Sequence, residues 1–130
     1  MELHVETCSS DVIEPGKIYD LMGKRGAGSV VLHFAVVKPM EGASGTTGHI
    51  DYAQAGDAQA ELRGIAEALC DQFTLADVIL VRRTGRLRVG DIISLVAASS
   101  PCSEDAFEAC KQGLVQVKRM KTILKDEVYA

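Results

Sequence analysis

The sequence has few aromatic residues, no tryptophan and no long apolar segment. Phe, Tyr and Trp make up 5% of the 130 residues, whereas hydrophobic residues as a group reach 47%. A core must therefore be built mainly from Val, Ile, Leu and Ala, and a chain of this length can bury one as a single domain, expected over residues 1–130. No apolar run reaches the roughly 20 residues that a membrane-spanning helix needs, so no membrane segment is expected.

A secretion signal and a metal-binding pattern are also lacking. The first residues, MELHVETCSSD, carry acids where a signal peptide has basic residues. The four cysteines have no C-x-x-C spacing, and His4, His33 and His49 fit no metal-ligand spacing. We expect a cytoplasmic protein without metal or cofactor, with His33 and His49 satisfied within a sheet. Cys70 and Cys110 are expected to be small core residues on helices.

Positive charge is concentrated in one part of an otherwise acidic chain. The formal net charge is -4, which argues against a nucleic-acid binder held by phosphate contacts alone. Residues 111–125 nevertheless contain five basic residues and no acid, namely Lys111, Lys118, Arg119, Lys121 and Lys125. A local basic patch on an acidic protein favours a small anionic ligand or an acidic partner surface.

Apolar periodicity predicts an α+β domain with a mixed or mainly antiparallel sheet and two long helices. Strands are expected at residues 2–8, 29–37, 49–53, 77–83 and 91–98, and helices at 15–22, 57–73 and 103–121. Asp57 and Ser103 are the expected N-caps of the long helices. The glycine-rich residues 39–48 are expected to form a loop, with Gly85 and Gly90 as turn residues between two strands.

Two sites within the last predicted helix have chemical interest. If that helix continues, Lys118, Lys121 and Lys125 share one face and can bind phosphate together. Lysines are also common at helix C-termini because the helix dipole favours cations there, so both interpretations stay open. At the other end, free N–H groups near Cys102 and Ser103 can bind an anion, or the segment is simply a capped helix with a buried cysteine. Gly113 costs about 1 kcal/mol relative to alanine in mid-helix, so it is expected to allow close packing.

The last third of the sequence resembles the large, catalytic subunit of molybdopterin synthase. The string RTGRLRVGD is followed by SLVAASSP, by AFEAC and then by two lysines seven residues apart, Lys118 and Lys125. The family has a G-x-L-x-x-G-[DE] turn, a strand, an S-[SA]-x-H-R segment, an A-F-E-A helix and a K-x6-K pair in this order. The match spans about residues 76–127.

The resemblance implies an α/β-hammerhead-like fold with a small added β subdomain. It also implies an enzyme of molybdenum cofactor biosynthesis that inserts two sulfurs into cyclic pyranopterin monophosphate, a pterin phosphate, to make molybdopterin. The sulfur comes from the C-terminal thiocarboxylate of a small ubiquitin-like subunit, whose Gly-Gly tail enters the pocket of the large subunit. The large subunit forms a homodimer with one small subunit at each end, which gives a heterotetramer.

The resemblance also assigns roles to residues. Lys118 matches the catalytic lysine near the thiocarboxylate, and Lys125 matches a substrate-binding lysine, with Lys121 close by. Lys38 falls near the arginine of the family but lacks its planar fork. Cys102 and Ser103 replace the His-Arg pair of the family, and a shorter C-terminal tail is expected. These departures keep two further hypotheses open: a divergent, non-catalytic homologue that binds a partner, and Cys102 as a replacement nucleophile or sulfur carrier.

Overall fold

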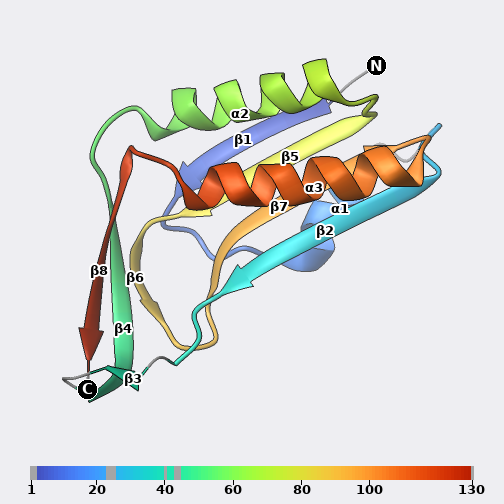
Figure 1. The fold of residues 1–130 in the computed structure, drawn as a ribbon. Coiled ribbons are helices and arrows are strands. Elements are labelled where there is room, and N and C mark those ends of the chain that lie inside the picture. Colours follow the sequence, from blue (N-terminus) through green and yellow to red (C-terminus); the bar gives the residue numbers. More distant parts are fainter. Residues whose placement is uncertain (1–2, 23–25, 40, 43–44, 130) are drawn as a thin grey trace.

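A computed structural model describes residues 3–22, 26–39, 41–42 and 45–129 of the chain (Figure 1). Its elements are β1 (Leu3–Ser9), α1 (Pro15–Leu21), β2 (Ser29–Val36), β3 (Glu41–Gly42), β4 (Gly45–Gln54), α2 (Ala58–Gln72), β5 (Asp77–Arg83), β6 (Gly85–Arg88), β7 (Ile92–Ser100), α3 (Ser103–Lys118) and β8 (Ile123–Tyr129). The predicted α+β class is confirmed. Within these residues no helix is both long and apolar enough to cross a membrane.

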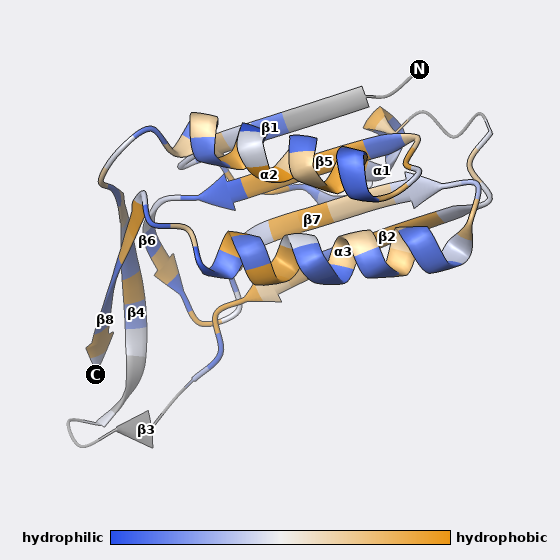
Figure 2. Ribbon diagram, turned by 45° about the horizontal axis from the view of Figure 1, so that its top comes forward, coloured by the Kyte–Doolittle hydropathy of each residue, from blue (hydrophilic) through white to orange (hydrophobic). Residues whose placement is uncertain are grey.

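The larger sheet has the strand order β1-β5-β7-β2 and is mixed, as predicted. β1 runs parallel to β5, whereas β7 is antiparallel to both β5 and β2. The central strands β5 and β7 are strongly hydrophobic (Figure 2), because both of their faces are covered. Helices α2 and α3 pack on the face that carries Leu80 and Val96, and α1 packs on the opposite face against Ile79 and Leu95.

A second, smaller sheet is built around β4, which lies between β6 and β8. The stretch 39–48 was expected to be a loop, and this was wrong for the residues that the structure describes: β4 already begins at Gly45 and pairs with β3. Residues 40, 43 and 44 of that stretch lie outside the described residues. The stretch between Gly85 and Gly90 likewise contains β6 rather than a plain turn. Both glycines have positive φ angles, +94° and +95°, so they allow the chain to turn into and out of β6.

The last long helix differs from its prediction at both ends. Its N-cap is Cys102 rather than Ser103, and it ends at Lys118 rather than near 121. The chain then turns and enters β8, a strand that was not predicted. The turn forms because Met120 and Ile123 are buried, which brings the segment back onto the core. Lys121 therefore lies in a turn and Lys125 on a strand, so the three lysines do not share a helix face.

The helices otherwise match their sequence patterns. The Asp57 carboxylate accepts a hydrogen bond from the backbone N–H of Ala60 at 3.0 Å, which confirms Asp57 as the N-cap of α2. Gly113 is buried in α3, and a Cβ added there would lie 2.9 Å from Val96 Cγ1. The expected close packing at Gly113 is thus confirmed.

Candidate active site

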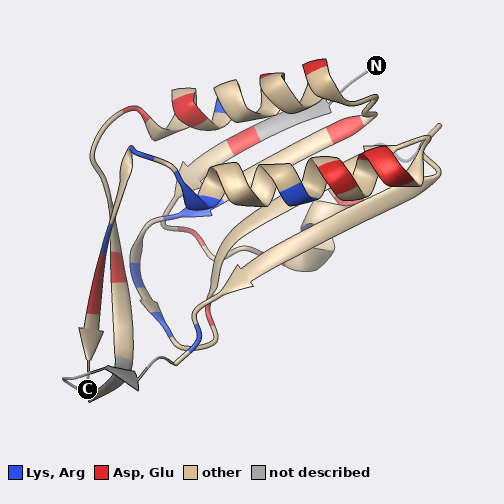
Figure 3. Ribbon diagram, in the orientation of Figure 1, with Lys and Arg blue, Asp and Glu red and all other residues tan. Residues whose placement is uncertain are grey.

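A cavity of about 630 Å³ lies where the C-terminal end of α3 meets both sheets. Its polar and charged lining residues are His33, Lys38, Tyr52, Arg82, Ser94, Lys118, Lys125 and Glu127. They come from β2, β4, β5, β7, α3 and β8, and from the residue pair that follows β2. In Figure 3 the end of α3 and β8 each carry basic residues, and both segments lie where the two sheets meet.

The larger sheet supplies the floor of the cavity. Arg82 on β5 pairs with Ser94 on β7, and Ser94 pairs with Ala35 on β2, so these three residues form a row across the sheet. Side chains two residues apart on a strand point to the same face, so Arg82 lies on the face of Leu80, which packs against the long helices. The row therefore continues the core face of the sheet up to the cavity.

Lys118 and Lys125, which have the spacing of the lysine pair in the family, reach the cavity from different elements. Lys118 is the last residue of α3, and Lys125 lies on β8, opposite Tyr52 of β4. Lys125 Nζ lies 3.6 Å from Glu127 Oε1, and both residues line the cavity. Lys38 joins them from the segment after β2. The structure therefore brings together Lys38, Lys118 and Lys125.

The turn between α3 and β8 is held by a single carboxylate of α2. Glu61 accepts hydrogen bonds from the backbone N–H groups of Lys121 and Thr122, at 3.0 and 3.1 Å, and from the Thr122 hydroxyl at 2.6 Å. Burial acts to raise the pKa of Glu61, but these hydrogen bonds favour the ionised form more strongly, so the pKa lies below its ordinary value. Glu61 thus fixes the position of β8 relative to the end of α3.

Arg82 is a buried cation that the sequence analysis did not single out. It is 8% exposed, and its guanidinium lies over the Tyr52 ring, 4.5 Å from the centroid. Burial lowers the pKa of the Arg82 guanidinium, although an arginine stays charged at neutral pH. A signal was present in the sequence: Val78, Leu80 and Arg82 alternate on one face of a buried strand, so the arginine had to face the core.

His33 and His49 are not satisfied within the sheet as predicted. Nδ1 of His33, which lines the cavity, and Nε2 of His49 are both buried and lack a hydrogen-bond partner among the described residues. Nε2 of His49 does lie 3.5 Å from Asp51 Oδ2. We treat this contact as a weak ion pair rather than a hydrogen bond.

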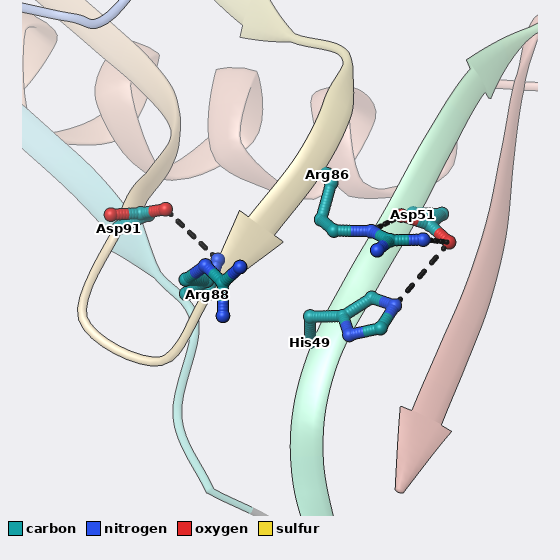
Figure 4. A network of polar contacts seen from close by, with 5 residues as sticks. All are labelled: His49, Asp51, Arg86, Arg88 and Asp91. Atoms are coloured by element: carbon teal, nitrogen blue, oxygen red, sulfur yellow. Dashed lines mark hydrogen bonds and ion pairs between the residues drawn. The ribbon is translucent and has the colours of Figure 1, made fainter.

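The contact of His49 with Asp51 belongs to a polar network on the second sheet (Figure 4). Arg86 Nε donates to Asp51 Oδ1 at 3.0 Å, across the β4–β6 pair in which the two residues are register partners. The hydrogen bond from Arg86 is the main reason why the pKa of Asp51 lies below its ordinary value. Asp51 and Arg86 do not line the cavity, so this network joins strands rather than contributing to the site.

The other predicted site residues lie away from the cavity. Lys121 is exposed in the turn after α3 and does not line it. Cys102 and Ser103 lie at the opposite end of α3, which at 16 residues is roughly 24 Å long. Cys102 is exposed, and the Ser103 hydroxyl contacts that of Ser29 at 2.5 Å. Within one chain these two residues therefore cannot act on the same ligand atoms as Lys118.

The cysteines in the long helices have structural surroundings. Cys110 is buried, and burial raises its pKa to about 11, so its thiol stays protonated and unreactive at neutral pH. Cys70 is partly buried and packs against the same core cluster. The prediction that both are core residues on helices is confirmed, with Cys70 at the edge of the core.

Comparison with known proteins places this fold and cavity in a family. The sequence model of the MoaE protein family matches residues 8–120. The chain belongs to the MoaE family. It is 32% identical over 84 residues to the molybdopterin synthase catalytic subunit of Staphylococcus carnosus, a match that covers 64% of this chain and 56% of that relative. The chain thus matches only about half the length of this curated MoaE relative.

Solved structures agree with the MoaE assignment at the level of the fold. The crystal structure of molybdopterin synthase from Staphylococcus aureus superposes with a TM-score of 0.86 at 22% identity and covers 95% of this chain and 90% of that chain. A complex of subunits 1 and 2 of the molybdopterin-converting factor from Helicobacter pylori gives a TM-score of 0.67 at 10% identity, over 99% of this chain and 89% of that chain. The implied family fold is therefore confirmed.

Proposed function

We propose that this chain is the catalytic subunit of a molybdopterin synthase. It transfers sulfur from the C-terminal thiocarboxylate of a small ubiquitin-like subunit to cyclic pyranopterin monophosphate, in molybdenum cofactor biosynthesis. The observation that carries the proposal is the convergence of Lys118 and Lys125 on one cavity, from the end of α3 and from β8. Membership of the MoaE family and the name of the Staphylococcus carnosus relative support it.

The geometry suits the chemistry of a thiocarboxylate and a phosphate. A tail that ends in Gly-Gly is narrow enough to enter a cavity of about 630 Å³. The thiocarboxylate sulfur bonds to the substrate, and water then cleaves the resulting thioester, which releases the tail as a carboxylate and leaves the sulfur on the substrate. Lys118, at the end of α3, is placed to stabilise the oxyanion that develops when water attacks the thioester carbonyl. Lys125 and Lys38 supply cations for the substrate phosphate. No metal or cofactor is invoked, because amines suffice for these roles.

Reconstitution tests this function directly. The chain, the thiocarboxylated small subunit and cyclic pyranopterin monophosphate are combined, and molybdopterin is measured. We expect product, and we expect Lys118→Ala to lower its rate at least about 100-fold, because a group that stabilises transition-state charge is lost. Lys111→Ala is the matched control, since Lys111 is exposed on the same helix and does not line the cavity. Absence of product with a partner that demonstrably binds would disprove the proposal.

A second candidate is a divergent, non-catalytic homologue that binds a partner. It is favoured by one observation: Cys102 and Ser103 stand where the family has His-Arg. The double variant Cys102→His/Ser103→Arg separates the two candidates. If the natural chain is inactive and this variant makes molybdopterin, the second candidate is correct. Restoration of molybdopterin synthesis by the unaltered chain, in a strain that lacks its usual large subunit, would exclude it.

The assembly and location follow from the same proposal. We expect a homodimer with one small subunit at each end, as the resemblance implies, and the complex of subunits 1 and 2 from Helicobacter pylori supports a second subunit as partner. We also place the protein in the cytoplasm, because its four cysteines are free thiols, which a reducing compartment maintains. Copurification of a small protein that ends in Gly-Gly is the first test of the partner.

A further inference from the structure

The floor of the cavity contains a buried cation that has no counter-charge among the described residues. Arg82 is 8% exposed, and no carboxylate of the described residues is among the groups that act on its charge. Glu127 lines the same cavity, but its carboxylate lies 3.6 Å from the Lys125 amine. The groups that act on its charge are Tyr52 and Cys8, and neither is a carboxylate. A buried charge without an opposite charge costs free energy, so the site is electrostatically complementary to an anion.

Two buried nitrogen atoms without hydrogen-bond partners also indicate that the site suits an anion. Nε of Arg82 and Nδ1 of His33 are both buried, and neither has a hydrogen-bond partner among the described residues. His33 lies two residues before Ala35, which shares a row across the sheet with Ser94 and Arg82. All four residues line the cavity. Tyr52 holds the guanidinium by a ring contact and a hydrogen bond, whereas the Nε group of Arg82 remains for a ligand.

We propose that Arg82 is an oxyanion-binding residue at the floor of the cavity that Lys118 and Lys125 also line. The planar fork of the arginine suits a phosphate or a carboxylate, either of which accepts two N–H groups at once. His33 supplies a further polar contact beside it. Anion binding by Arg82 does not require the proposed function. Only the natural source of the anion rests on it, which is either the phosphate of the small substrate or the carboxyl terminus of the partner tail.

Binding of simple anions by the full chain tests this subsite. Inorganic phosphate, a peptide that ends in Gly-Gly with a free carboxylate, and the same peptide with an amidated end are titrated by calorimetry. We expect Arg82→Met to lower the affinity for phosphate or for the carboxylate peptide about tenfold or more, because charge-assisted hydrogen bonds are lost. Loss of phosphate alone identifies the phosphate source, and loss of the carboxylate peptide alone identifies the tail.

The neighbouring arginine is the matched control. Arg83 is next on β5, points to the opposite face, and its Nε donates to the Ser10 carbonyl at 3.3 Å. Arg83→Met should bind both anions as the natural chain does. The proposal is overturned if neither anion binds the natural chain, if Arg82→Met binds both with unchanged affinity, or if Arg83→Met weakens binding as much as Arg82→Met.

Thermal denaturation adds a measurement that a purely structural arginine would not affect. Phosphate or the peptide should raise the Tm of the natural chain but not that of Arg82→Met. If Arg82→Met does not fold, Arg82→Lys takes its place: it keeps the charge without the fork, and unchanged binding of both anions by this variant would overturn the proposal. These assays need neither partner nor turnover. A chain that binds an anion through Arg82 yet makes no molybdopterin would disprove only the proposed function.

Discussion

Gly113 and Gly64 show at the scale of single residues how packing decides the effect of one methyl group. Both are glycines within long helices, where alanine is intrinsically better by about 1 kcal/mol. An added Cβ at Gly113 would lie 2.9 Å from Val96 Cγ1 and 3.2 Å from Leu69 Cδ1, whereas nothing lies within 4 Å of one at Gly64. The same substitution therefore meets a full core in α3 and open space in α2.

We predict opposite signs for the two alanine variants. Gly113→Ala should lower the free energy of unfolding by about 1–2 kcal/mol, because overpacking outweighs the gain in helix propensity. Gly64→Ala should raise it by up to about 1 kcal/mol. Denaturant unfolding of the two variants beside the natural chain checks both. A stabilised Gly113→Ala would show that Val96 and Leu69 move aside without cost.

The spatial surroundings of Arg82 and His33 could not be predicted from the sequence alone. The strand pattern predicted that Arg82 lies on a strand, yet its partner in space, Tyr52, comes from β4 of the other sheet. That contact depends on how two sheets meet, which no local pattern encodes. Lys118 and Lys125, by contrast, could be named from their spacing within a family pattern.

At the scale of elements, the carboxylate of Glu61 ties α2 to the turn between α3 and β8. Its three hydrogen bonds are made to Lys121 and Thr122. We predict that Glu61→Ala lowers the free energy of unfolding by about 1–3 kcal/mol, because two backbone N–H groups and a hydroxyl lose a charged acceptor. It should also slow the proposed reaction, since Lys118 and Lys125 flank this turn. Glu67→Ala, at an exposed position of the same helix, should change neither quantity.

The same carboxylate predicts a pH dependence. The pKa of Glu61 is lower in the folded protein than its ordinary value of 4.5, so its ionised form stabilises the fold fully above that value. This stabilisation is lost as the pH falls from 4.5 through the lowered folded pKa. The difference in free energy of unfolding between the natural chain and Glu61→Gln should therefore shrink over this range. A difference that stays constant from pH 7 down to the acid transition would contradict the assignment.

Prediction of elements worked where each strand carries its own pattern. β5 and β7 are apolar on both faces, and α2 has an apolar stripe, so all three were found close to their bounds. β8 and the first half of β4 were missed, because ILKDEVY has no clear alternation and GTTG resembles a loop. β8 becomes a strand by pairing with β4, mostly with its second half, which joins residues far apart in the sequence. The first residues of β4 pair instead with the short strand β3.

At the scale of the whole molecule, the cavity lies where the two sheets meet. Its floor comes from β5, β7 and β2, and its walls come from β4, β8 and the end of α3. A ligand that contacts both sides should restrain them together. We predict that phosphate slows amide hydrogen exchange in β4, β5 and β8 but leaves α1 unchanged, since α1 packs on the opposite face. Protection that is equal in α1 and β8 would indicate general stabilisation instead.

The position of β4 between β6 and β8 has a consequence for synthesis. The ribosome completes β4 before β6 or β8 exists, because both lie later in the sequence, and only β3, which pairs with the first residues of β4, precedes it. A nascent β4 therefore has unpaired backbone groups on both edges, which is a state prone to pairing with other chains. β6 covers one edge, and only β8, made last of these strands, covers the other. The strand that brings Lys125 to the cavity thus also ends the period of aggregation risk.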